Sequence, residues 1–68
     1  MFSRGSIVQH LVGMPPGKEN KRLIVICGDE ETKIHFTGRV IDVGSENHTP
    51  IGFTSKKLCK SLFREINT

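Results

Sequence analysis

The sequence predicts a small β-rich α+β domain, in which an antiparallel sheet is covered by one C-terminal helix. Two observations predict it: short apolar runs alternate with turn-forming residues, and the apolar period changes from two to about four near the C-terminus. With 68 residues, the chain is close to the smallest size at which one hydrophobic core can offset the entropy of folding. We therefore expect a single domain over residues 1–68.

Three runs rich in Ile, Val, Leu and Phe predict strands. These runs are Ser6–Val12, Lys21–Cys27 and Thr32–Val43. The segments GMPPGKEN, GDEE and GSENHTP that follow them contain the residues typical of turns. Short connections of this kind favour antiparallel hairpins. The second run is apolar on both of its faces, which predicts that it is the central strand.

Gly38 lies inside the third predicted strand. A glycine at such a position often marks a bulge or a sharp bend. The sheet is therefore expected to be strongly bent, and its form to be SH3-like or that of a partly closed barrel.

The segment TSKKLCKSLFREI has the apolar spacing of a helix. After a short extended piece, Ile51–Phe53, one face of this segment collects five apolar residues. Thr54 or Ser55 can supply the N-cap oxygen. The pattern predicts a helix from about Ser55 to Ile66 that packs on the sheet through Leu58, Cys59, Leu62, Phe63 and Ile66.

The positive charge is concentrated in this last segment. Up to Phe53 the basic and acidic residues balance, so the formal net charge of +3 comes entirely from residues 54–68. In a helix Lys56, Lys60 and Arg64 would line up, because they are spaced by four residues. Such a stripe attracts nucleic acid or an acidic protein surface. The predicted contact surface consists of Lys56, Lys57, Lys60, Arg64 and Arg22.

No catalytic residue, metal site or cofactor is predicted. The loop GMPPGKEN differs from a phosphate-binding loop in its glycine spacing, and Glu19 follows Lys18 where a hydroxyl is needed. His10, His35 and His48 are scattered, whereas zinc ligands normally come in pairs close in sequence. Acidic neighbours disfavour a thiolate at Cys27. Nearby lysines favour one at Cys59, but its place on the apolar face predicts burial, so both cysteines are expected in the core. The loop is expected to connect two strands.

Direct reading of bases is not expected either. The chain has no Tyr or Trp, and Phe36, Phe53 and Phe63 fit core positions, so only Phe2 would be free to stack on a base. The longest apolar run, LIVIC, is too short to span a bilayer. The first residues lack the apolar stretch of a secretion signal. We expect a cytoplasmic protein that does not contact a membrane and keeps both thiols reduced.

The second half of the chain contains FTGRVI and IGFTSKKLCKSLF, which are similar to a pattern F-x-G-x-V followed by G-x-x-S-x-x-W-x-x-x-x-F. Through this pattern the chain resembles a family of small orphan proteins of bacteriophages and mobile elements. Leu58 stands where that pattern has Trp. The resemblance implies a compact β-rich accessory module that binds a host component, and it implies no catalytic residue.

Together these features predict a small non-enzymatic binding module for an anionic partner. Two alternatives remain open. The first is an inhibitor or adaptor that binds a host protein through an exposed strand edge, or that forms a homo-oligomer. The second is an oligomeric sponge that sequesters a small nucleotide between subunits.

Overall fold

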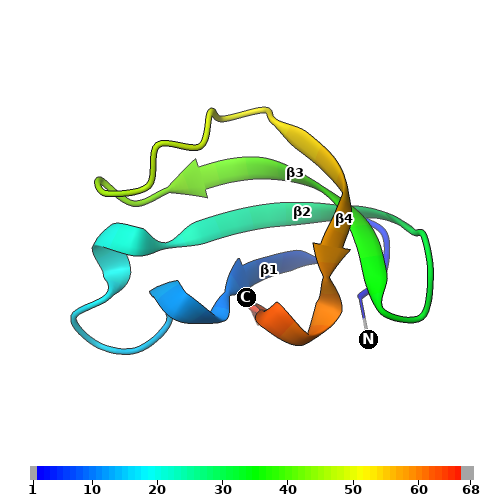
Figure 1. The fold of residues 1–68 in the computed structure, drawn as a ribbon, viewed down its shortest axis with the longest axis horizontal. Coiled ribbons are helices and arrows are strands. Elements are labelled where there is room, and N and C mark those ends of the chain that lie inside the picture. The colour runs from blue at the N-terminus through cyan, green and yellow to red at the C-terminus, as the bar shows by residue number, and fades with distance from the viewer. Residues whose placement is uncertain (1, 67–68) are drawn as a thin grey trace.

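Residues 2–66 fold into one antiparallel sheet of five strands, in the order β4-β3-β2-β1-β5 (Figure 1). The structure is a computed structural model and describes residues 2–66. The strands are β1 Ile7–His10, β2 Leu23–Glu30, β3 His35–Val43, β4 Thr54–Cys59 and β5 Phe63–Glu65. Three single 3₁₀ turns accompany them: η1 Leu11–Gly13, η2 Glu19–Lys21 and η3 Lys60–Leu62.

The prediction that the second apolar run is the central strand is confirmed. β2 lies between β1 and β3, and both pairings are antiparallel. Val25 and Cys27 are buried on the core side of β2, while Ile24 and Ile26 are half-buried on its other side. The second face of β2 is therefore partly covered as well, in agreement with the apolar pattern on both faces of this run.

The predicted C-terminal helix is absent, and the predicted α+β class is therefore wrong. The segment from Ser55 to Ile66 forms β4, the η3 turn and β5 instead. β4 pairs with β3, and β5 crosses to the opposite edge of the sheet to pair with β1. In Figure 1 this segment runs along β3, bends, and descends to the turn near the C-terminus. Within residues 2–66, no helix is long and apolar enough to cross a membrane.

The sheet bends at bulges but does not close into a barrel. Relative to β3, both neighbouring strands carry one extra residue close to Gly38: β2 between Cys27 and Glu30, and β4 between Ser55 and Leu58. Such bulges increase local twist and bend a strand. The bend predicted at Gly38 therefore arises from extra residues on the two strands beside it. In the described part of the chain β4 and β5 remain separate edges, so the predicted SH3-like or partly closed barrel form is wrong.

A type II turn leads into β4 where a short extended piece was expected. The Phe53 N–H donates to the Pro50 carbonyl at 3.2 Å, and Gly52 at the third position has a φ of 93°. Only glycine adopts that conformation without strain. The Val40 N–H then donates to the Phe53 carbonyl at 2.8 Å, which extends the contact between β3 and the incoming chain.

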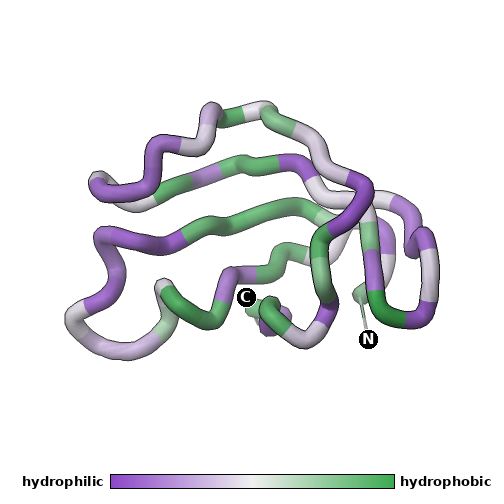
Figure 2. The backbone as a smooth tube through the Cα atoms, viewed as in Figure 1, coloured by the Kyte–Doolittle hydropathy of each residue, from purple (hydrophilic) through white to green (hydrophobic). Residues whose placement is uncertain are grey.

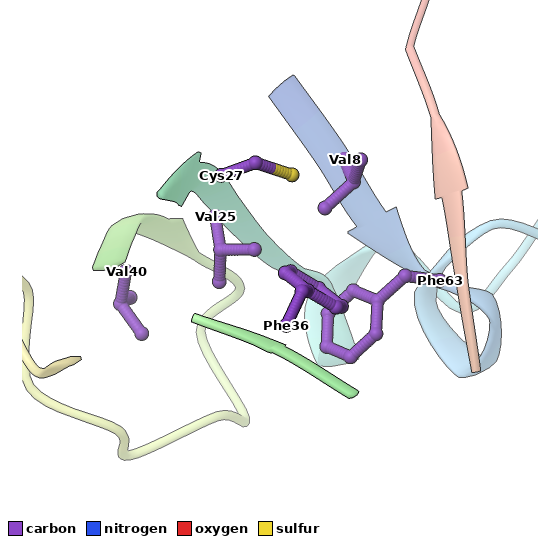
Figure 3. Close-up of a cluster of buried hydrophobic side chains, with 6 residues drawn as sticks. All are labelled: Val8, Val25, Cys27, Phe36, Val40 and Phe63. Atoms are coloured by element: carbon purple, nitrogen blue, oxygen red, sulfur yellow. The ribbon is translucent and has the colours of Figure 1, made fainter. Parts of the chain in front are cut away.

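The core lies on one side of the sheet and is small (Figure 3). The rings of Phe36 and Phe63 meet edge to face with centroids 5.3 Å apart. Aromatic pairs prefer this geometry because the positive edge of one ring meets the negative face of the other. The buried side chains are Val8, Val25, Cys27, Phe36, Val40 and Phe63.

Apolar residues follow the middle strands, and the connecting loops are mostly polar (Figure 2). Phe36 and Phe63 are buried as predicted, but Phe53 is 53% exposed and lies outside the core. Phe2, predicted to be free, is half-buried and packs edge to face on Phe36 with centroids 4.9 Å apart. The N-terminal segment therefore completes the core that the short strands leave open.

Candidate functional site

The five cations predicted to form one contact surface come from β4, η3, β5 and the residue before β2. The line of Lys56, Lys60 and Arg64 depended on the helix, and without the helix these residues belong to β4, η3 and β5. β4 and β5 are at opposite ends of the strand order. Arg22 precedes β2 and Lys57 is in β4. The predicted helical stripe of Lys56, Lys60 and Arg64 is therefore wrong.

Two of these cations are already matched by carboxylates. Arg22 Nε donates to Asp42 Oδ2 at 2.8 Å. This hydrogen bond raises the pKa of Arg22 and holds the pKa of Asp42 below its usual range, because each charge stabilises the other. Lys60 forms an ion pair with Glu30, and its side chain is only 22% exposed. Each of these cations therefore has part of its donor capacity occupied by a contact inside the fold.

Lys56 and Lys57 are brought together by the bulge in β4. Phe36 pairs with Leu58 and Gly38 pairs with Ser55, so two lysines oppose the single residue Thr37. Both lysines are exposed. The sequence predicted them as part of a helix face, but a bulge in an edge strand places them side by side.

Arg39 adds a third cation that the sequence analysis did not select. Along β3, Phe36, Gly38 and Val40 are buried, so Arg39 points to the side away from the core. It pairs with Thr54 at the start of β4 and is exposed. The alternation of FTGRV contained this signal, because a residue between two buried ones on a strand must face outward. We call Arg39, Lys56 and Lys57 the β3–β4 basic patch.

The charges around the β3–β4 basic patch leave a positive excess. Within residues 2–66, none of its three cations forms an ion pair. The carboxylate of Glu31 reaches this region, because it accepts a hydrogen bond of 2.9 Å from the Thr37 hydroxyl. Three cations and one carboxylate give a local charge of +2.

A hollow of about 380 Å³ adjoins the patch. Its lining includes Thr37, Arg39 and Thr54, and the backbone of Gly28 and Gly38. Arg4 also lines it, but this arginine is paired with Asp29. The donor that the hollow offers to a phosphate oxygen is the Arg39 guanidinium. The Thr37 hydroxyl already donates to Glu31, and the Thr54 hydroxyl donates to the Gly52 carbonyl.

The loop from Gly13 to Asn20 connects β1 to β2, as predicted, through the turns η1 and η2. The Gly17 N–H donates to the carboxylate of Glu19 at 3.0 Å. A phosphate held by this loop would have to displace that carboxylate. The loop therefore satisfies one of its own donors and is a connection rather than an anion cradle.

The histidines and cysteines do not assemble into a metal site. No group of three or more His, Cys, Asp or Glu side chains in the described residues could hold an ion. Cys27 is buried and Cys59 half-buried, and neither forms a disulfide. Burial raises the pKa of the Cys27 thiol, whereas a hydrogen bond to Ser61 lowers that of Cys59. The sequence predicted both cysteines in the core. This is confirmed for Cys27 and wrong for Cys59, which is only half-buried.

Comparisons with protein-family models, with curated proteins and with solved structures found no match to this chain.

Proposed function

We propose that the protein is a small non-enzymatic binding module that contacts the phosphate backbone of a nucleic acid through the β3–β4 basic patch. The observation that carries this proposal is that three cations without an ion pair in residues 2–66 lie together in one region. Arg4, Arg22 and Lys60 are neutralised by ion pairs. The three cations of the patch are exposed and share one region with a net charge of +2.

Protection of an edge strand does not account for the whole patch. Lysines and a bulge on an edge strand commonly prevent pairing with another chain, and this explains Lys56 and Lys57. It does not explain Arg39, because β3 lies inside the sheet between β2 and β4. An exposed guanidinium on an interior strand, with no ion pair in residues 2–66, is better explained by contact with an anion.

Contact with phosphates is favoured over reading of bases. Stacking on bases needs an exposed aromatic ring next to the cations. The exposed ring of Phe53 lines a separate hollow with His48, Thr49 and Pro50. With three cations the expected contact is weak and independent of sequence. A cytoplasmic location is part of the proposal, since the two unpaired cysteines fit a reducing compartment.

The edge-strand alternative is less well supported. β4 is interrupted by its bulge, and β5 has only three residues, Phe63–Glu65. Short and bulged edges pair poorly with an added strand. The other possible partner is an acidic protein surface, such as that of the host protein that the phage resemblance implies. The experiment distinguishes this partner from a nucleic acid.

The test is binding of a fluorescent single-stranded oligonucleotide, measured by anisotropy at several salt concentrations. For three phosphate contacts with a single strand, the logarithm of affinity should fall with the logarithm of salt with a slope of about −2. The triple variant Arg39→Glu, Lys56→Glu and Lys57→Glu should abolish binding. A matched control variant with Lys18→Glu, Lys21→Glu and Arg64→Glu changes the net charge equally. This control should retain most of the binding.

Equal loss in both triple variants would show that only net charge matters and would overturn the assignment of the patch. No binding by the natural chain at low salt would overturn the nucleic-acid proposal. A pull-down then compares the natural chain with the patch variant, each with and without nuclease. An acidic protein partner is captured by the natural chain whether or not nuclease is added, and it is lost with the patch variant.

A further inference from the structure

A second hollow lies on the core side of the sheet, where the N-terminal segment meets the η3 turn. Its volume is about 810 Å³, and its lining includes Phe2, Phe63, Lys33, Lys60 and Ser61. These residues come from both ends of the chain and from the loop between β2 and β3. We call it the Phe2–Phe63 groove. Its volume falls within the range of small-molecule sites, about 300–1,000 Å³.

The apolar part of the groove consists of two fixed aromatic rings. Both Phe2 and Phe63 pack edge to face on Phe36, with centroid distances of 4.9 and 5.3 Å. Phe63 also meets His10 edge to face at 5.1 Å. Rings held in this way need little ordering when a flat apolar ligand binds against them. The groove therefore presents an aromatic surface that is set before any ligand arrives.

The polar part of the groove carries two lysines. The Lys60 N–H donates to the Ile34 carbonyl at 2.9 Å, which holds η3 against the loop that carries Lys33. Lys60 is paired with Glu30, another lining residue. Its ammonium has three donors, so this pair leaves donors for a second acceptor. Lys33 has no ion-pair partner within residues 2–66.

From this combination we propose that the Phe2–Phe63 groove binds a small aromatic anion, in which one flat ring system carries one carboxylate or phosphate. The ring lies against Phe2 and Phe63, and the anionic group is bound by Lys33 and Lys60. Two lysines and Glu30 give the lining a net charge of +1, which disfavours a cation. The groove lies on the opposite side of the sheet from the β3–β4 basic patch, so the two proposals are independent.

The site is tested by ¹⁵N–¹H correlation spectra of the full chain, titrated separately with adenosine monophosphate and with phenylacetate. The amide signals of Lys33, Lys60 and Ser61 should shift on binding, and those of β4 should not. The two compounds distinguish a phosphate from a carboxylate as the anion. Adenosine and inorganic phosphate are the controls, because each carries only half of the proposed ligand. Each should bind at least about fivefold more weakly than adenosine monophosphate. Adenosine lacks the charge-assisted contact to the lysines, and inorganic phosphate lacks the contact with the rings.

The variants Lys33→Met and Phe2→Ala should each weaken binding by about fivefold or more. Lys33 is exposed, so its replacement leaves the fold intact, and the same spectra check this. Lys56→Met is the matched control and should bind as the natural chain does. The proposal is overturned if neither compound shifts these signals at about 5 mM, a concentration above typical weak-site affinities. Equal binding of inorganic phosphate, or shifts centred on β4, would also overturn it.

Discussion

Leu58 of β4 covers Gly38 of β3 so closely that a Cβ atom added to Gly38 would lie 2.6 Å from Leu58 Cδ1. The same added atom would lie 3.1 Å from Val25 and 3.2 Å from Phe36. The absence of a side chain at Gly38 is what lets the edge strand β4 approach the core. This contact links the bulged edge strand, which carries two cations of the β3–β4 basic patch, to the centre of the fold.

Gly38→Ala should destabilise the protein by about 1–3 kcal/mol, the usual cost of overpacking a filled core. Gly28→Ala is the matched control in the neighbouring strand. An added Cβ there would lie 3.5 Å from Thr37 Cγ2, which is ordinary van der Waals contact. We expect a change within about 0.5 kcal/mol for this control. Urea unfolding followed by circular dichroism measures both, and equal effects would contradict the role assigned to Leu58.

Phe36→Ala should unfold the chain at 25 °C. Phe36 is fully buried and contacts the rings of both Phe2 and Phe63. Such a truncation costs about 3–5 kcal/mol, comparable to the few kcal/mol that one core supplies in so small a domain. Phe53→Ala removes the same ring from a position that is 53% exposed, and this variant should remain folded. The dispersion of amide signals distinguishes the two states, and a folded Phe36→Ala chain would disprove the prediction.

The hairpins of this fold could be predicted from sequence because their signals are local. The apolar faces of β2 and the turn residues between strands indicate antiparallel pairing, and the alternation around Phe36 indicates which face is buried. Arg39 could have been assigned to the outer face on the same grounds. These features depend on neighbours within a few residues, and the structure agrees with them.

The C-terminal segment could not be predicted in this way because a bulge hides its period. In β4 the inward residues Ser55 and Leu58 are three apart, since Lys56 and Lys57 both oppose Thr37. With the later Phe63 in β5, this spacing imitates a helix face. What decides the outcome is non-local: β4 must cover Gly38 and β5 must pair with β1. A short isolated helix is only marginally stable in water, so pairing with the sheet prevails.

Asp42→Asn should reduce stability at neutral pH and have no effect in acid. The pKa of Asp42 is lowered in the folded protein, chiefly by the hydrogen bond from Arg22. Its stabilising contribution is therefore complete above the unfolded pKa of about 3.9 and is lost as pH falls through the lower folded value. The difference in melting temperature between variant and natural chain should be present at pH 7 and disappear below that range. Glu65→Gln, which changes the net charge equally outside any ion pair of residues 2–66, is the control. A difference that persists unchanged in acid would contradict the assignment.

Cys59 should react with a thiol reagent well before Cys27. The Cys59 sulfur lies 3.2 Å from the Ser61 hydroxyl oxygen, and this hydrogen bond lowers the thiol pKa, so more thiolate is present at a given pH. Cys27 is 4% exposed and its pKa is raised by burial, so it reacts only when the fold opens. Labelling with an aromatic disulfide should show one fast thiol and one at least about tenfold slower.

Ser61→Ala should move the pH profile of the fast reaction to higher pH, while Leu62→Ala, a change at the exposed neighbour, should leave it in place. Equal rates for both thiols in the folded chain, or a profile that Ser61→Ala does not move, would contradict this account of the two cysteines.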